Sequence, residues 1–166
     1  MGAYRVAIIT LSDKGSVGQR VDESGPVLRR LCLERGLVVV SEEILPDEPE
    51  LLSGRLREIC DQRLAELVLT TGGTGLSPRD HTPEATLAVA ERLVPGLAEV
   101  MRAESLKKTN RAMLSRAVAV TRAQTLIINL PGSPKGAREN FEAIAPALGH
   151  GLAILTGSTG ECAQPS

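Results

Sequence analysis

The sequence TTGGTGLSPRD at residues 70–80, called here the glycine loop, decides how the rest of the chain is arranged. The apolar run 67–69 precedes it and is typical of a buried strand. After it, Thr82 is a predicted helix N-cap, with Pro83 in the first helical position. The glycines therefore lie between a strand end and a helix start, where backbone N–H groups are unpaired and the helix dipole favours an anion. This pattern predicts a loop that binds a negatively charged group.

The glycine loop matches neither of the two common phosphate-binding motifs. It lacks the G-x-x-x-x-G-K-[ST] pattern and the G-x-G-x-x-G spacing, so a plain connecting turn fits the glycines equally well. Asp80 favours a ligand site of a particular kind. A carboxylate about 4 Å from a phosphate would repel it by roughly 4 kcal/mol at an effective dielectric of about 20. Either Asp80 points away from the anion, or a divalent cation lies between the two.

The composition is that of a globular protein. The chain has 166 residues, 42% of them hydrophobic, and a formal net charge of −1. This predicts a single domain over residues 1–166, with a core at about 4–150 and a flexible tail at about 156–166. One Tyr, one Phe and no Trp argue against base stacking on single-stranded nucleic acid, and the net charge supplies no strong basic field. We therefore expect no nucleic-acid partner.

The sequence predicts a cytoplasmic protein. The first residues lack the apolar core of a signal peptide, and no apolar run is long enough to span a membrane, so no membrane partner is expected. The three cysteines are an odd number without C-x-x-C spacing. Cys32 and Cys60 fall in helical patterns and are interpreted as small buried apolar residues in a reducing compartment, and Cys162 lies in the predicted tail.

Apolar runs and helical stripes alternate along the chain. The predicted strands cover residues 5–11, 37–45, 67–69, 118–120 and 125–130. The predicted helices cover residues 26–35, 51–59, 82–92, 97–107 and 137–150, with Pro95-Gly96 ending the third of them. This alternation predicts an α/β fold, a three-layer α/β/α sandwich with a mostly parallel central sheet.

Polar segments follow several of the predicted strands, where open α/β sheets bind ligands. The segments are Ser12-Asp13, Asp47, the glycine loop and Pro131–Pro134. Their convergence on one sheet edge predicts a pocket. Asp47 and Asp80, together with phosphate oxygens, would supply the hard ligands that Mg²⁺ prefers, and Asp13 is a third candidate. Each Asp, taken singly, also fits a turn or capping role.

The two histidines fit surface or packing roles better than catalytic ones. His81, beside Asp80, is a candidate general base. A helix N-terminus is a poor place for an imidazolium, which favours packing or solvent exposure. His150 is predicted near a helix end and on the surface.

The sequence resembles the MogA/MoaB family of molybdenum cofactor biosynthesis proteins, which includes the G domains of plant and animal homologues. The glycine loop and TPEAT at 82–86 resemble the family signature. Further stretches recur in the family's order over about residues 4–150: LSD at 11–13, DESGP at 22–26, PDE at 46–48, ESL at 104–106, MLSR at 113–116 and INLPGSP at 128–134. Many matches in register are far more specific than one glycine motif.

The resemblance implies molybdopterin adenylyltransferase activity with ATP, molybdopterin and Mg²⁺. The terminal phosphate of molybdopterin would attack the α-phosphate of ATP, and pyrophosphate would leave. Asp47 and Asp80 match the two functional aspartates of the family and would bind Mg²⁺ and position phosphate. The implied binding residues for nucleotide and molybdopterin are Ser12, Asp13, Thr71, Gly72, Gly73, Thr74, Gly75, Ser77, Ser115, Pro131, Gly132, Ser133 and Pro134. Both histidines lie outside the matched set.

The resemblance also implies partners. Family members are typically homotrimers, with hexamers among MoaB-type proteins, and a MoeA-like molybdenum insertase would act downstream. Because some members keep the fold without activity, a non-catalytic molybdopterin carrier is the first alternative. An enzyme acting on another nucleotide, like domains of the competence-damage type, is the second. A purely structural scaffold is the third, and it leaves the clustered polar loops unexplained.

Overall fold

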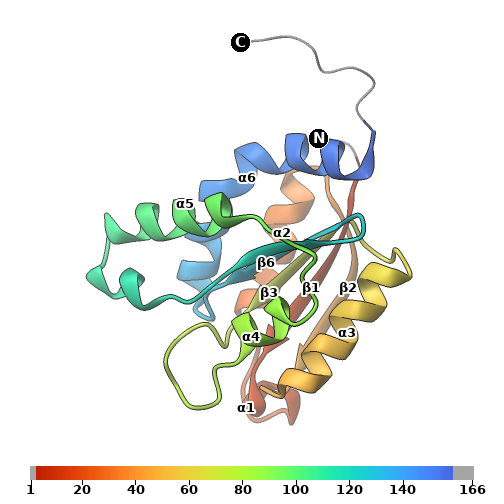
Figure 1. Ribbon diagram of the computed structural model, residues 1–166. Coiled ribbons are helices and arrows are strands. Elements are labelled where there is room, and N and C mark those ends of the chain that lie inside the picture. Colours follow the sequence, from red (N-terminus) through yellow and green to blue (C-terminus); the bar gives the residue numbers. More distant parts are fainter. Residues whose placement is uncertain (1–2, 159–166) are drawn as a thin grey trace.

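A computed structural model describes residues 3–158, which form three layers around one mixed sheet (Figure 1). Within these residues the sheet has six strands in the order β2-β1-β3-β6-β5-β4. Strands β2, β1, β3 and β6 are parallel, whereas β5 and β4 are antiparallel to their neighbours. The bounds are β1 Arg5–Leu11, β2 Val38–Leu45, β3 Leu67–Thr71, β4 Arg92–Leu93, β5 Ala119–Arg122 and β6 Thr125–Leu130. The predicted α/β class with a mostly parallel sheet is confirmed.

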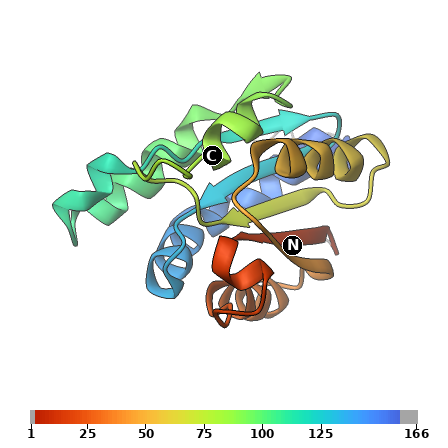
Figure 2. The ribbon, with the colours of Figure 1, turned by 90° about the horizontal axis from the view of Figure 1, so that it is seen from below.

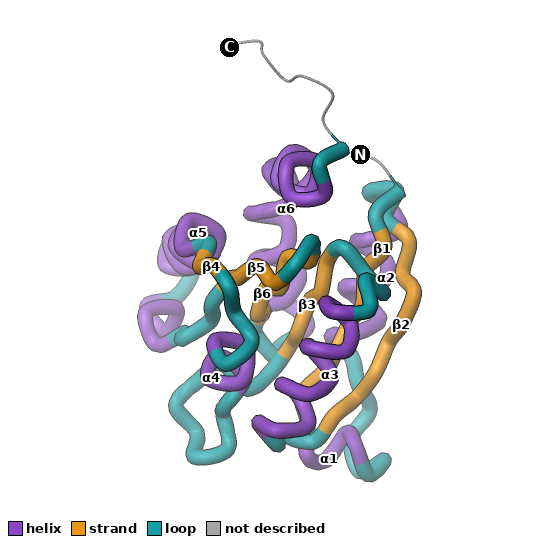
Figure 3. The backbone as a smooth tube through the Cα atoms, turned by 45° about the vertical axis from the view of Figure 1, so that its right-hand side comes forward, coloured by secondary structure: helices purple, strands orange, loops and turns teal. Residues whose placement is uncertain are grey.

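Helices cover both faces of the sheet, as parallel strands require. The helices are α1 Asp13–Ser16, α2 Ser24–Glu34, α3 Pro49–Asp61, α4 Thr82–Leu87, α5 Pro95–Leu106, the 3-10 helix η1 Asn110–Leu114 and α6 Pro134–Thr156. One hydrophobic core joins the sheet to α2, α5 and α6, and a second joins it to α3 and α4. Helices α3 and α4 lie in front of the sheet in Figure 3. No described helix is both long enough and apolar enough to cross a membrane.

The two cores use alternate residues of the same strands. In β1, Val6 and Ile8 belong to the core with α2, while Ala7 and Ile9 belong to the core with α3. Successive side chains of a strand point to opposite faces, so a strand buried on both faces is mainly apolar. Phe141 is fully buried, and aliphatic side chains fill most of the remaining core. The continuous apolar runs of the sequence follow from this double burial.

The carboxyl ends of β1, β2, β3 and β6 lie at one edge of the sheet because these strands are parallel. Figure 2 views the molecule from this edge, with α1 in front. The loops that leave it include every polar segment expected to bind a ligand. The fold therefore gathers these segments on one side of the molecule.

The predicted helix 82–92 is wrong over its second half. Helix α4 ends at Leu87, and Arg92–Leu93 form the edge strand β4. Hydrogen bonds from Glu91 N to Thr121 O (2.9 Å) and from Val94 N to Ala119 O (2.8 Å) hold this segment against β5. Pro95 begins α5 instead of ending the preceding helix, a position where its missing N–H costs nothing.

The last helix is longer than the predicted range 137–150. Ser133 caps α6 by accepting a hydrogen bond from Gly136 N, and the helix continues through Pro146 to Thr156. His150 therefore lies within the helix and not near its end. Thr156, where the flexible tail was predicted to begin, is helical, and residues 159–166 with Cys162 lie outside the described part.

Candidate functional site

A pocket of about 650 Å³ opens at the carboxyl edge of the sheet. This first pocket is lined by segments that follow β1, β2, β3 and β6. The structure brings together these predicted site residues: Ser12, Asp13, Asp47, Thr71, Gly72, Gly73, Asp80, Gly132, Ser133 and Pro134. Asp47 and Asp80 are far apart in sequence but line the same pocket.

The first glycines adopt backbone conformations that suit glycine. Gly72 has φ +100° and Gly73 has φ +68°. The loop is also held against α4, since Thr82 donates from N to Gly73 O (3.1 Å) and from Oγ1 to Gly72 O (2.9 Å). The predicted N-cap is thus displaced by one residue: His81 occupies that position without a side-chain cap bond, and the Thr82 hydroxyl is a donor to the glycine loop. The result is a tight strand-to-helix turn.

The middle of the glycine loop offers unpaired donors. Within residues 3–158, the N–H groups of Gly73, Thr74 and Gly75 donate to no protein acceptor. Gly72 N, in contrast, donates to Leu130 O at 3.1 Å. Successive free N–H groups beside a glycine-rich turn form a concavity suited to anions. The glycine pattern between a strand end and a helix start predicted such unpaired backbone N–H groups.

Asp47 and Asp13 hold each other through reciprocal bonds. Asp47 Oδ2 accepts from Asp13 N at 3.1 Å, and Asp13 Oδ1 accepts from Asp47 N at 3.0 Å. Burial raises the pKa of the Asp47 carboxyl, and repulsion from Asp13 and Asp80 adds to the effect. The loops after β1 and β2 are therefore fixed to each other beside an acidic pocket.

Asp13 is already neutralised by an arginine of the glycine loop. Arg79 donates to Asp13 from Nε (2.6 Å) and Nη2 (3.0 Å), and also to Glu48 Oε1 (2.7 Å). The Arg79 hydrogen bond is the main reason why the pKa of Asp13 lies below its usual value. Asp13 thus anchors the glycine loop across the pocket mouth, a role unlike that of a metal ligand.

The donor set fits Mg²⁺ only if a substrate completes it. Asp47 and Asp80 offer hard carboxylate oxygens, and their mutual repulsion would be relieved by a divalent cation. Among residues 3–158, no group of three or more His, Cys, Asp or Glu side chains is arranged to hold a metal. Phosphate oxygens and water would therefore supply the remaining ligands, as is usual for Mg²⁺.

A second pocket, of about 300 Å³, adjoins the glycine loop at Thr74 and Gly75. It contains four further predicted site residues, namely Thr74, Gly75, Ser115 and Pro131, and shares Ser133 with the first pocket. Ser77 lines neither pocket; its N–H donates to Asp80 Oδ2 at 3.1 Å and so supports that carboxylate. His81 is likewise outside both pockets, and His150 lines an apolar groove between α5 and α6.

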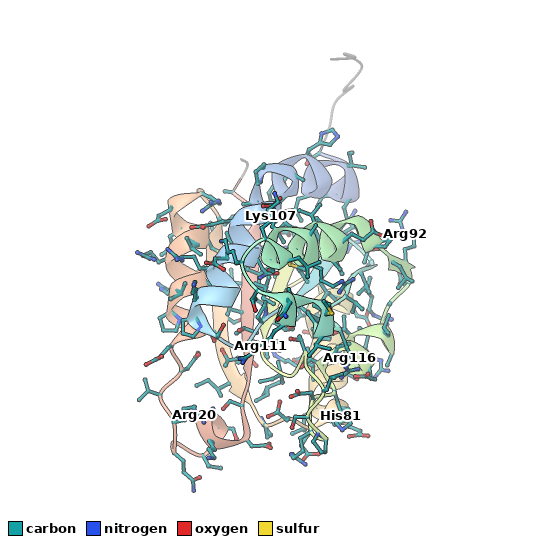
Figure 4. The ribbon with its side chains drawn as sticks, turned by 90° about the vertical axis from the view of Figure 1, so that its left-hand side faces the viewer. Arg20, His81, Arg92, Lys107, Arg111 and Arg116 are labelled. Atoms are coloured by element: carbon teal, nitrogen blue, oxygen red, sulfur yellow. The ribbon has the colours of Figure 1, made fainter. Side chains whose placement is uncertain are left out.

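Several lining residues were missed by reasoning from sequence. In the first pocket, Asp22 accepts hydrogen bonds from Thr10 Oγ1 (2.9 Å), Ser24 Oγ (3.2 Å) and Gly25 N (3.0 Å). The signal was the long polar loop after β1. In the second pocket, the missed charged or polar residues are Arg102, Ser105, Lys108, Thr109, Arg111, Glu139 and Asn140, and Glu139 pairs with Lys108 at 3.1 Å. Figure 4 shows Arg111 projecting from η1.

Comparison with known proteins gives consistent similarities over most of the chain. Residues 7–150 match the family model described as a probable molybdopterin binding domain. The molybdopterin adenylyltransferase of Helicobacter pylori strain J99 is 40% identical over 160 residues, which cover 95% of this chain and 91% of that protein. That of Escherichia coli strain K12 is 42% identical over 153 residues, covering 90% and 78%. The crystal structure of MoaB from Thermus thermophilus superposes with a TM-score of 0.88 at 51% identity, covering 93% and 97%.

Proposed function

Because the chain belongs to the MogA/MoaB family of molybdopterin-binding proteins, we propose that it is a molybdopterin adenylyltransferase of molybdenum cofactor biosynthesis. A phosphate oxygen of molybdopterin forms a bond to the α-phosphorus of ATP. The bond from that phosphorus to the bridging oxygen breaks, and pyrophosphate leaves with the electron pair. The products are adenylylated molybdopterin and pyrophosphate.

The observation that carries this proposal is the pair of pockets that adjoin one glycine loop and share Ser133. Gly73 lines the first pocket and Thr74, the next residue, lines the second. A transfer between two bound molecules needs their reacting groups side by side. The larger, acidic pocket with Asp47 and Asp80 suits an ATP–Mg²⁺ complex, and the smaller pocket with Lys108 and Arg111 suits the phosphorylated pterin.

The residues have distinct roles in this proposal. The free N–H groups of Gly73, Thr74 and Gly75 bind phosphate oxygens, while Asp47 and Asp80 hold Mg²⁺. Mg²⁺, when bound, neutralises charge that develops on the phosphates. Ser77 supports the Asp80 carboxylate through its N–H. The remaining binding residues line the two pockets: Ser12, Asp13, Thr71, Gly72, Ser115, Pro131, Gly132, Ser133 and Pro134.

Pyrophosphate release is the direct test. Purified protein is incubated with molybdopterin, ATP and Mg²⁺, and pyrophosphate is expected only when the pterin is present. Asp80→Asn should lower the rate by about a hundredfold or more while pterin binding persists. Glu99→Gln, which alters an exposed carboxylate of α5, is the matched control. A protein that binds pterin and releases no pyrophosphate would be the carrier of the alternative hypothesis.

The proposal extends to assembly and partners. The family resemblance supports a cytoplasmic homotrimer, with a hexamer as the alternative, that passes its product to a MoeA-like insertase. Sedimentation velocity on the full chain measures the assembly. A monomer at micromolar concentration would contradict the proposed trimer without affecting the proposed reaction.

A further inference from the structure

Arg116 lies directly after η1, where the chain leaves the second pocket and enters β5. Its backbone N–H donates to Thr74 O at 2.9 Å, so the two segments run beside each other. Figure 4 shows Arg116 between the helical segment that carries Arg111 and the loop that carries His81. It lines neither pocket among the residues described. Any role in the reaction is therefore exerted through another residue.

The Arg116 guanidinium contacts both ends of the exposed part of the glycine loop. Nε donates to Gly75 O at 2.8 Å, and Nη2 donates to Asp80 O at 2.7 Å. Nη1 pairs with Glu84 in the first turn of α4. Because the guanidinium is planar and rigid, three simultaneous contacts fix the spacing of the two carbonyls and the helix.

The Glu84 contact shows that the guanidinium is held as an ion pair. Burial would raise the pKa of Glu84, but hydrogen bonds, first among them the one from Arg116, outweigh burial and keep the pKa below its usual value. Arg116 is itself two-thirds covered, with a side-chain exposure of 33%. A partly covered, hydrogen-bonded pair is a stronger anchor than an exposed one.

Between the two carbonyls the segment has one other side-chain anchor, Arg79, which pairs with Asp13 and Glu48 on the side of α1 and α3. Residues 76–79 are exposed, and the Leu76 side chain is 66% exposed. Asp80 is oriented by a short turn, in which its N–H donates to Ser77 O (2.9 Å) and its Oδ2 accepts from Ser77 N (3.1 Å). That turn is fixed to the body of the protein at the Asp80 carbonyl. Arg79 holds the segment from the side of Asp13, and Arg116 holds its Asp80 end, so removal of Arg116 frees the residue that carries the carboxylate.

We infer that Arg116 is a positioning residue for adenylyl transfer: it holds the glycine loop so that the Asp80 carboxylate faces the first pocket. This inference rests on the proposed function for its kinetic consequence. Its structural consequence, an ordered loop at residues 75–80, is independent of that function. The two consequences are measured separately.

The experiment compares Arg116→Ala and Arg116→Lys with Arg122→Ala. Arg122 is a matched control because it also binds a carboxylate and a carbonyl, donating to Asp61 (2.9 and 3.0 Å) and to Val89 O (3.2 Å). It pairs with Thr125 at the opposite end of β6, away from the pockets. The readouts are kcat and KM for ATP from pyrophosphate release, and amide hydrogen exchange of residues 74–80.

Arg116→Ala should lower kcat by about a hundredfold, as misplacement of a reactive group by roughly 1 Å does, and change KM for ATP by less than about threefold. Arg116→Lys, which can reach one carbonyl, should retain about a tenth of the wild-type kcat. Within 74–80, exchange of the hydrogen-bonded Ser77 and Asp80 amides should accelerate about tenfold in Arg116→Ala. Arg122→Ala should show neither effect.

Unchanged exchange at 74–80 in Arg116→Ala would overturn the inference, as would equal kcat losses in Arg116→Ala and Arg122→Ala. If the wild-type protein itself releases no pyrophosphate, the proposed function fails. In that case the exchange comparison still decides whether Arg116 orders the loop.

Discussion

Gly72 and Gly132 bring two main chains together at the base of the first pocket. A Cβ on Gly132 would lie 3.2 Å from Gly72 Cα, and a Cβ on Gly72 would lie 2.5 Å from Leu11 O. Gly72 also has φ +100°, which side chains rarely adopt. The loops after β1, β3 and β6 can therefore approach this closely only because glycines occupy both positions.

We predict that Gly72→Ala lowers the free energy of unfolding by at least about 2 kcal/mol, through the strained φ and the clash with a backbone oxygen that cannot move away. Gly54→Ala is the matched control. Gly54 lies within α3 with nothing near its added Cβ, so alanine should raise the free energy by about 0.5–1 kcal/mol. Urea unfolding of the wild type, Gly72→Ala and Gly54→Ala measures both free-energy changes. Equal changes in the two variants would contradict the strain argument.

The Asp47 carboxyl makes stability depend on pH. Burial is the main reason why the folded-state pKa of Asp47 lies above its ordinary value of 3.8. At a pH between the unfolded-state pKa and the folded-state pKa, the folded protein therefore binds more protons than the unfolded chain. Stability contributed by protonated Asp47 is thus present below the unfolded pKa and lost as pH rises through the folded pKa. As pH rises from about 4 to 7, the free energy of unfolding of Asp47→Asn should increase relative to that of the wild type, as measured by urea unfolding.

Asp61→Asn supplies a control of opposite sign. The hydrogen bond from Arg122 lowers the pKa of Asp61, so its contribution is present above the unfolded pKa and lost as pH falls. Asp61→Asn should therefore lose stability relative to wild type as pH rises. The same trend in both variants would refute the assignment for Asp47.

At the scale of elements, β3, β6 and α4 are joined by one buried side chain. Asn129 is fully buried in β6. Its Nδ2 donates to Thr70 Oγ1 and Thr86 Oγ1, both at 3.0 Å, and its Oδ1 accepts from Val118 N at 3.2 Å. If the amide were removed, Thr70 Oγ1 and Val118 N would lose this partner, whereas Thr86 Oγ1 would still donate to Thr82 O.

Asn129→Ala is expected to lower the free energy of unfolding by about 3 kcal/mol, because buried polar groups lose their partners and a cavity is left. Asn110→Ala, at an exposed position of η1, should change it by less than about 0.5 kcal/mol. Chemical denaturation gives both values. A loss below about 1 kcal/mol for Asn129→Ala would show that water replaces the amide.

The elements that the sequence predicted well are those whose signal is local. The strands at 5–11 and 125–130 are mainly apolar because helices cover both of their faces. Helix α4 was predicted too long because Arg92–Leu93 pair with β5, a partner that no local pattern reveals. The extension of α6 beyond residue 150 was missed because Pro146 and nearby glycines weaken its helical pattern.

The candidate site divides in the same way. The positions of Asp47, Asp80 and the glycine loop at one edge could be predicted, since parallel strands present their carboxyl ends together. The division into two pockets could not, because it depends on how η1, α5 and α6 pack beside the loop. Nothing in the sequence pattern singles out Lys108 or Arg111, which line the second pocket.

At the scale of the whole molecule, ligand binding should stabilise all three layers, because the first pocket is built from loops of four strands. A non-hydrolysable ATP analogue with Mg²⁺, at about a hundred times its Kd, should stabilise the fold by about 2.7 kcal/mol and raise Tm accordingly. EDTA should remove most of this shift. In Asp80→Asn the increase in Tm caused by the analogue should be insensitive to EDTA, whereas Glu99→Gln should behave as wild type. Thermal unfolding with and without EDTA measures this difference.

The aliphatic core has a practical optical consequence. The chain holds one Phe, one Tyr and no Trp, and Phe141 is sealed inside the molecule. The polypeptide is therefore almost transparent in the near ultraviolet, where adenine and pterin rings absorb. The absorbance of a ligand bound in either pocket will therefore exceed that of the protein. Binding, transfer and release of the ligand can be followed by absorbance without attaching a label.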